Sequence, residues 1–160
     1  METATDIFKQ ALYNEVHSTA FFAKAAEMTR DDESRMLFLE LSSMEEDHAS
    51  MLVAKGQKAP CNHSVDLAAY LKELESSVAP VMSDEELATI QDGDPKSVLR
   101  LAIKLEEQAK ETYVKLAAEA ADLEVKSYCL ELVKQETGHA NALTRLLHSM
   151  DMDPEDRPGL

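Results

Sequence analysis

The stretch Glu45-Glu46-Asp47-His48 is a Glu-x-x-His motif, and Glu136-Thr137-Gly138-His139 repeats it 91 residues further along the chain. Thirty residues before the glutamate of each motif stands another glutamate, Glu15 in the first copy and Glu106 in the second. The same offset superposes flanking residues: Ala11 on Ala102, Ala26 on Ala117, Asp31 on Asp122, Leu39-Glu40-Leu41 on Leu130-Glu131-Leu132, Ala49 on Ala140 and Leu52 on Leu143. One Glu-x-x-His would be a weak signal, but two copies of Glu-x29-Glu-x2-His in 160 residues are a strong one.

Apolar and small residues three and four positions apart predict four long helices, over residues 4–28, 33–54, 95–121 and 123–150. The repeated glutamates and histidines fall on the apolar faces of these helices. In the second helix, for example, Glu45 and His48 stand between Leu41 and Leu52 on one face. We therefore expect six ionisable side chains in the core: Glu15, Glu45, His48, Glu106, Glu136 and His139.

The spacing of thirty residues has a geometric meaning. The polar break at Arg30-Asp31 lies midway between Glu15 and Glu45. Two antiparallel helices joined at this break bring both carboxylates to the same height, about 22 Å from the turn. The break near Ala121-Asp122 does the same for the second pair of glutamates.

Residues 55–94 form a connection that is too long for a simple loop. Two short helices are expected inside it, one over residues 65–75 and one that begins at the capping box Ser83-Asp84-Glu85-Glu86. The predicted fold is therefore all-α, with two antiparallel helical hairpins joined by one long crossover into a four-helix bundle. A single domain over residues 1–150 and a flexible tail over residues 151–160 are expected.

The composition excludes several kinds of partner. The chain has 31 acidic and 16 basic side chains, and this net charge of -15 argues against a nucleic-acid partner. No apolar stretch approaches the roughly 20 residues that cross a bilayer, and residues 1–16 lack the pattern of a signal peptide. Cys61 and Cys129 form no C-x-x-C pair, which favours a reducing setting. We expect a cytoplasmic protein without a membrane partner.

Four carboxylates buried at one level would repel one another and take up protons unless a positive charge lies between them. Two divalent cations balance four carboxylates and leave both imidazoles neutral, which is the form that binds metal. Mixed carboxylate and imidazole ligands suit iron or manganese, and the absence of thiolate ligands argues against a structural zinc site. A single glutamate or histidine in a helical core is ordinary, but six such residues, arranged as two copies of the same spacing, are not. A bundle that keeps the ligands and has lost its activity is the alternative.

The pattern of one glutamate from each of two helices and Glu-x-x-His from the other two resembles the ferritin-like di-iron carboxylate proteins. Within them, the chain looks like a stand-alone rubrerythrin-type domain. This resemblance implies that the metal ligands, which are also the catalytic residues, are Glu15, Glu45, His48, Glu106, Glu136 and His139. It also implies that Glu45 and Glu136 bridge two iron ions, with manganese as a possible replacement, and that Glu15 and Glu106 are terminal ligands.

The chain departs from the rubrerythrin pattern in two respects. Rubrerythrins carry a further glutamate three residues after the first glutamate of the second half, and here that position is Ala109. The two metals are therefore expected to be nearly symmetric. The chain also lacks the two C-x-x-C pairs of a rubredoxin-like domain, so an external electron donor is expected. Glu107 should lie on a flank, and Tyr113, the counterpart of Phe22, either bonds a ligand carboxylate or packs in the core.

The leading interpretation is an oxidoreductase whose reduced di-metal centre reacts with peroxide or dioxygen, as a rubrerythrin-like peroxidase or ferroxidase in a homodimer. The first alternative is a ferritin-like protein for iron storage, which a cage of many subunits would favour. The second is a di-iron oxygenase for a hydrophobic substrate, which an apolar channel beside the metals would favour.

Overall fold

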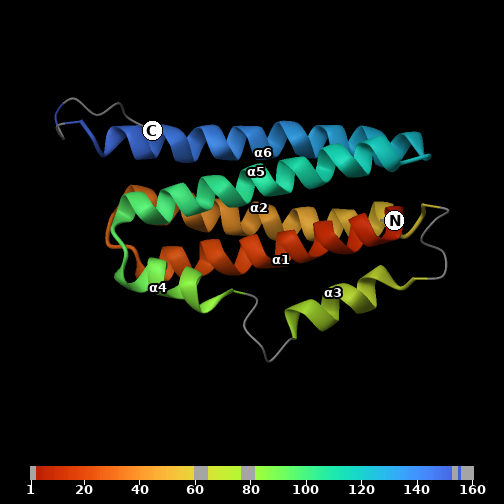
Figure 1. The fold of residues 1–160 in the computed structure, drawn as a ribbon, viewed down its shortest axis with the longest axis horizontal. Helices are drawn as coiled ribbons and strands as arrows, with labels where there is room; N and C mark the ends of the chain where they lie inside the picture. Colours follow the sequence, from red (N-terminus) through yellow and green to blue (C-terminus); the bar gives the residue numbers. More distant parts are fainter. Residues whose placement is uncertain (1–2, 60–64, 77–81, 153–154, 156–160) are drawn as a thin grey trace.

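The computed structural model describes residues 3–59, 65–76, 82–152 and 155, and all regular secondary structure in these residues is helical. The helices are α1 (Ala4–Met28), α2 (Asp32–Gly56), α3 (Leu67–Glu75), α4 (Asp84–Asp92), α5 (Pro95–Glu119) and α6 (Leu123–Ser149). The hairpin of α1 and α2 lies beside the hairpin of α5 and α6 (Figure 1), with α1 packed against α5 and α2 against α6. The all-α prediction, with two hairpins and a long crossover, is confirmed.

Side-chain caps set the start of each helix. At the turn of the first hairpin, the carboxylate of Asp31 accepts a hydrogen bond from the backbone N–H of Ser34 at 2.9 Å. At the turn of the second hairpin, Asp122 accepts one from the N–H of Val125 at 2.9 Å. Such caps satisfy N–H groups that have no partner inside the helix. Because the two caps are 91 residues apart, the sequence repeat includes the turns as well as the glutamates.

Three helix ends differ from the expected ones by two residues, and the start of α2 at Asp32 and the end of α6 at Ser149 each differ by one. The second helix was expected over residues 33–54, but α2 runs to Gly56 because this glycine lies against Phe8 rather than ending the helix. The expected end of the third long helix at residue 121 is too late, because Ala120 already has an extended backbone. The first short helix begins at Leu67 instead of residue 65, because the Asp66 side chain caps it.

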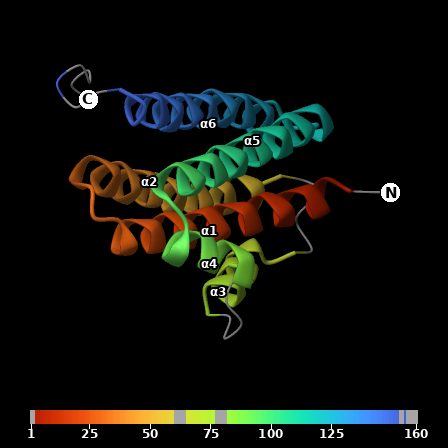
Figure 2. The same ribbon diagram turned by 60° about the vertical axis from the view of Figure 1, so that its left-hand side comes forward.

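The crossover returns along the outside of the first hairpin (Figure 2). Within it, α3 packs against α1 and α2, and α4 packs against α1 and α5. The Gln57 side chain anchors its start, because its amide accepts a hydrogen bond from the Leu67 N–H and donates one to the Val65 carbonyl. Cys61 and most of the tail expected over residues 151–160 lie outside the described residues.

The apolar interior is divided into two cores by one polar layer. The first apolar core lies toward the crossover end of α2 and includes Phe8, Leu12, Leu52, Leu67, Tyr113, Leu116 and Leu132. The second apolar core lies toward the turn between α1 and α2 and includes Phe21, Phe22, Phe38, Leu41, Leu99, Leu143 and Leu146. The four glutamates and two histidines of the repeat occupy the layer between these cores, and all six side chains are buried.

Gly56→Ala should destabilise the protein by about 1–3 kcal/mol, because an added Cβ would lie 2.6 Å from the Phe8 ring and 3.0 Å from Leu67. The control is Gly138→Ala, because Gly138 is a helical glycine with nothing within 4 Å of an added Cβ. This variant should gain up to about 1 kcal/mol from helix propensity. Urea unfolding followed by circular dichroism measures both changes. Equal stability of the two variants would contradict the tight contact at Gly56.

Candidate metal centre

The structure brings the six predicted residues together between the two hairpins. Their exposed fractions are 1% for Glu15, 1% for Glu45, 5% for His48, 1% for Glu106, 0% for Glu136 and 7% for His139. Each long helix contributes to the cluster, with one glutamate from α1 and α5 and a Glu-x-x-His from α2 and α6. The apolar cores on both sides separate this layer from solvent along the bundle axis.

The six side chains form two adjacent groups that share two members. The first group, which we call the first position, consists of Glu15, Glu45, His48 and Glu136, and ligand atoms of these residues all lie within 4.8 Å of one another. In the second position, the same holds for Glu45, Glu106, Glu136 and His139. Glu45 and Glu136 belong to both groups, so they stand where a bridging carboxylate between two ions would have to stand.

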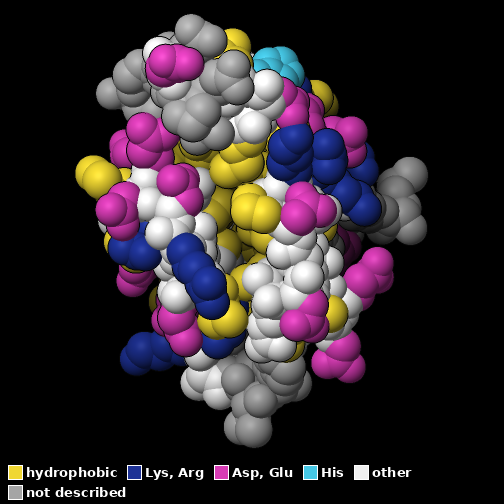
Figure 3. Space-filling view, turned by 90° about the vertical axis from the view of Figure 1, so that its left-hand side faces the viewer, with side chains coloured by type: hydrophobic (Ala, Val, Ile, Leu, Met, Phe, Trp, Pro, Cys, Tyr) yellow, Lys and Arg dark blue, Asp and Glu magenta, His cyan; other side chains and the backbone are white. Residues whose placement is uncertain are grey.

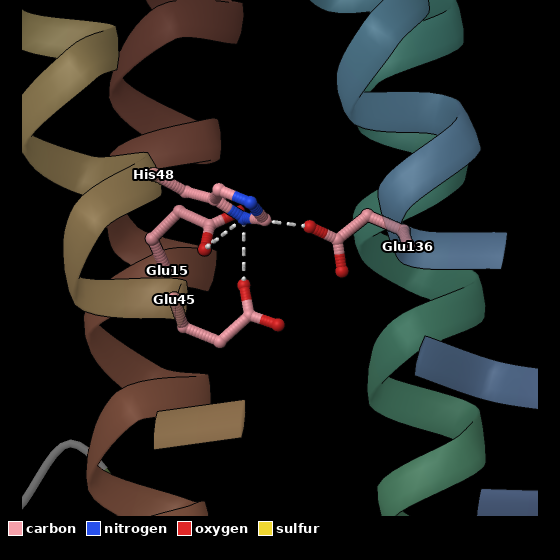
Figure 4. Close-up of side chains that lie close together, drawn as sticks. All are labelled: Glu15, Glu45, His48 and Glu136. Atoms are coloured by element: carbon pink, nitrogen blue, oxygen red, sulfur yellow. Dashed lines mark hydrogen bonds and ion pairs between the residues drawn. The ribbon is translucent and has the colours of Figure 1, made fainter. Parts of the chain in front are cut away.

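The His48 ring points into the space between the hairpins (Figure 4). Its Nδ1 lies 2.9 Å from Glu136 Oε1, 3.1 Å from Glu45 Oε2 and 3.6 Å from Glu15 Oε2. His139 mirrors this arrangement, with Nδ1 3.0 Å from Glu45 Oε1. The two rings stack with their centroids 5.8 Å apart. In each histidine, therefore, Nδ1 is the nitrogen that faces the carboxylates.

The four carboxyl groups are not ionised alike in the metal-free protein. Burial raises the pKa of Glu15 well above its usual range, and the neighbouring Glu45 raises it further. Burial and the contact with Glu136 raise the pKa of Glu106 in the same way. Burial acts in the same direction on Glu45 and Glu136, but hydrogen bonds with the partner glutamate and the histidines outweigh it and lower both pKa values. Each hairpin thus pairs a glutamate whose pKa is raised with one whose pKa is lowered.

The histidines carry the balancing charge. Burial lowers the pKa of each imidazole, but hydrogen bonds with the carboxylates outweigh it. The pKa of His48 rises far above its usual range, and the pKa of His139 rises to about 9. The carboxylates therefore favour the imidazolium form of both histidines.

The donor atoms fit two divalent cations. Among the described residues, Glu15 Oε2 and both carboxylate oxygens of Glu106 and Glu136 are buried and, apart from close contacts within the cluster itself, have no hydrogen-bond partner. Buried polar atoms are rarely left in this state unless a ligand or ion completes them. Oxygen and imidazole donors without a thiolate suit iron or manganese. With both ions present, four carboxylates would balance the charge and both imidazoles would be neutral.

Two further side chains contact the cluster. The Tyr113 hydroxyl donates a hydrogen bond to Glu15 Oε1, so of the two roles expected for this residue the structure shows the bond to a carboxylate. Gln135, which the sequence analysis missed, lies with its Oε1 2.6 Å from His48 Nε2. Glu107 is exposed and pairs with Lys110 at 2.9 Å, as expected for a flanking residue. His17 contacts Glu86 at 2.6 Å and links α1 to α4, away from the cluster.

Three cavities lie elsewhere on the bundle, and their linings include none of the six residues. The largest, of about 570 Å³, lies between α1, α4 and α5 beside His17. A second, of about 420 Å³, opens at the end of the bundle near the turn between α1 and α2 and is lined by Phe38, Ile90 and Val98. In Figure 3, which faces this end, hydrophobic side chains lie at the bottom of a hollow. None of these three cavities is lined by a residue of the glutamate and histidine cluster.

Across the parts of the chain that the structure describes, no helix is both long and apolar enough to span a membrane.

Comparison with known proteins agrees with the geometry of the bundle and the cluster. Neither the curated proteins nor the solved structures gave a match. A family model described as a ferritin-like domain matches residues 3–149, which is nearly the whole chain. With its helical bundle and its buried cluster of glutamates and histidines, the chain belongs to the ferritin-like domain family.

Proposed function

We propose that this protein is a rubrerythrin-like di-iron oxidoreductase that uses peroxide or dioxygen as its oxidant. The observation that carries the proposal is the pair of four-residue positions that share Glu45 and Glu136. When bound there, two ferrous ions would supply two electrons to the oxidant. Reduction of peroxide to two water molecules consumes two electrons and two protons. Manganese in one or both positions is compatible with the same donor atoms.

The residues of the chain have separate roles in this proposal. Glu45 and Glu136 would hold both ions at a fixed separation, because each belongs to both positions. Glu15 and Glu106 would each bind one ion, and His48 and His139 would bind through Nδ1, the nitrogen that faces the carboxylates. The two apolar cores would keep water from the layer, which strengthens the interaction of the carboxylates with the ions.

The electrons for repeated turnover would come from an external donor, because the sequence has no C-x-x-C pair of its own. A homodimer in the cytoplasm stays a prediction. Iron storage within the ferritin-like family is the alternative that the same ligands allow, and the number of ions bound distinguishes it from the proposed reaction.

The test is anaerobic titration with ferrous ion, followed by mixing with peroxide or with air-saturated buffer in a stopped-flow spectrometer. We expect about two ions per chain and oxidation of the loaded protein by peroxide, with reduction by an added electron donor restoring the ferrous form. Much less than one ion per chain would contradict the dinuclear centre. Uptake of many ions per chain after air oxidation would favour storage instead.

Ala109→Glu should raise peroxide turnover without loss of metal. Ala109 is buried on the same face of α5 as Glu106, one helical turn away, so the new carboxylate can reach the centre. The matched control is Ala109→Gln, which has the same size without the charge. Steady-state peroxide consumption with an added donor measures the effect. If the original protein already turns over peroxide as fast as Ala109→Glu, the alanine is irrelevant to the activity.

A further inference from the structure

The sequence repeat relates residues around the cluster to counterparts 91 positions away, and two of the pairs that differ in chemistry include a residue in hydrogen-bond contact with the cluster. Gln135 directly precedes Glu136, and its counterpart Met44 directly precedes Glu45. Tyr113 on α5 corresponds to Phe22 on α1. In both pairs, the residue from the second hairpin can form hydrogen bonds with a ligand and its counterpart cannot.

Both hydrogen-bonding residues act on the first position. His48 Nε2 lies 2.6 Å from Gln135 Oε1, while Nδ1 of the same ring faces the carboxylates. The amide oxygen can only accept, so Nε2 carries the proton and donates it to Gln135. This bond fixes the orientation of the ring and leaves the Nδ1 lone pair for an ion once the Nδ1 proton has gone. The Tyr113 hydroxyl holds Glu15 in place in the same way, by donating to Oε1.

The second position has no such support. His139 Nε2 is buried and has no hydrogen-bond partner among the described residues. Among the described residues, neither oxygen of Glu106 has a hydrogen-bond partner outside the cluster. Met44 is half-buried, and Phe22 is fully buried and stacked on Phe38. The two sets of ligands are therefore alike, but their surroundings are not, and the near symmetry expected from the sequence holds only for the ligands themselves.

We propose that Tyr113 and Gln135 are positioning residues that make the first position bind its ion more tightly than the second, so that the two ions are bound and released in a fixed order. The proposal rests on the proposed di-metal function. Hydrogen bonds to the outer side of a ligand orient it and raise its basicity, and their loss typically lowers metal affinity 10- to 100-fold. The second position, which lacks them, would fill last and empty first.

Variants that keep one position each allow the two affinities to be compared. Glu106→Ala removes a ligand that only the second position uses, and Glu15→Ala removes one that only the first position uses. Anaerobic titration calorimetry with manganese(II) should show one ion per chain in each variant. We expect the ion in Glu106→Ala to bind about 10- to 100-fold more tightly than the ion in Glu15→Ala. Equal affinities, or a tighter ion in Glu15→Ala, would overturn the proposal.

The role of Gln135 is then tested in both backgrounds. Gln135→Met, which copies Met44, should weaken binding about 10- to 100-fold in Glu106→Ala and leave binding in Glu15→Ala unchanged. Gln135→Glu keeps an acceptor oxygen and should restore the affinity. A purely structural role would weaken both backgrounds alike and would not be rescued, and that result would overturn the proposal.

A variant that is expected to gain metal affinity provides a further test, because loss of folding cannot produce a gain. Met44→Gln in the Glu15→Ala background should tighten the second position about tenfold, whereas the control Met44→Leu should change nothing. No gain from Met44→Gln would count against the proposal. The outcome is separable from the proposed function, because a protein that binds two equivalent ions keeps its di-metal centre and loses only the order of filling. A protein that binds no ion would overturn both.

Discussion

Glu136→Ala should abolish binding of both metal ions at once, and Glu45→Ala should do the same. Each of these glutamates belongs to both four-residue positions, so one substitution removes a ligand from each. Each variant also leaves three carboxylates where four are needed to balance two divalent cations. We expect affinity to fall by more than about 100-fold at each position, beyond what loss of an outer hydrogen-bond partner causes.

The measurement is titration of ferrous ion or manganese(II) into each variant, with metal content after gel filtration as a second readout. Glu107→Ala is the matched control, because Glu107 is adjacent to a ligand in sequence but is exposed and paired with Lys110. It should bind about two ions. Loss of metal in Glu107→Ala as large as that in Glu106→Ala would mean that the wrong glutamate has been identified.

Loading the protein with two divalent ions should release at least about two protons per chain near pH 6. These two come from the imidazolium groups of His48 and His139, the latter with a pKa of about 9. Any further protons come from Glu15 and Glu106, whose pKa values are raised by burial. Protons compete with the metal ions for the same ligand atoms, so the metal affinity falls as the pH falls. The overall constant for both ions should change by at least about 10²-fold per pH unit in this range.

A pH indicator in weakly buffered solution measures the protons, and calorimetry in buffers of different ionisation enthalpy gives an independent count. The Glu136→Ala variant, which should bind no ion, is the control and should release none. Release of fewer than two protons would show that the cluster is already deprotonated without metal.

The sequence was sufficient to predict the hairpins and the six clustered residues, because both depend on spacing along the chain. A helix advances by a fixed distance per residue, so thirty residues around a turn place Glu15 opposite Glu45 whatever the packing is. Asp31 and Asp122, which cap α2 and α6, marked where the turns of the two hairpins lie in the sequence. The end of α2 was predicted two residues too early, because Gly56 lies in close contact with Phe8 and this contact depends on the tertiary structure.

Contacts across the two hairpins could not be predicted, because they depend on how the hairpins are placed side by side. Gln135 adjoins a ligand and therefore points about 100° away from it around the helix, and only the position of α2 brings His48 against it. For Tyr113 the sequence allowed either a hydrogen bond or plain packing. The sequence contained one signal for both Gln135 and Tyr113. At each of these positions the second half of the repeat has a polar side chain where the first half has an apolar one, Met44 or Phe22.

The polar layer between the two apolar cores also determines how the hairpins are aligned along the bundle axis. Leucine and alanine side chains on the facing helices could pack in several registers, since one apolar contact resembles the next. A shift of α6 by one turn, about 5.4 Å, would move Glu136 away from His48 and bury its charge among the leucines of an apolar core. An unpaired buried charge is destabilising by several kcal/mol. The six residues of this layer therefore also select one alignment of the four helices.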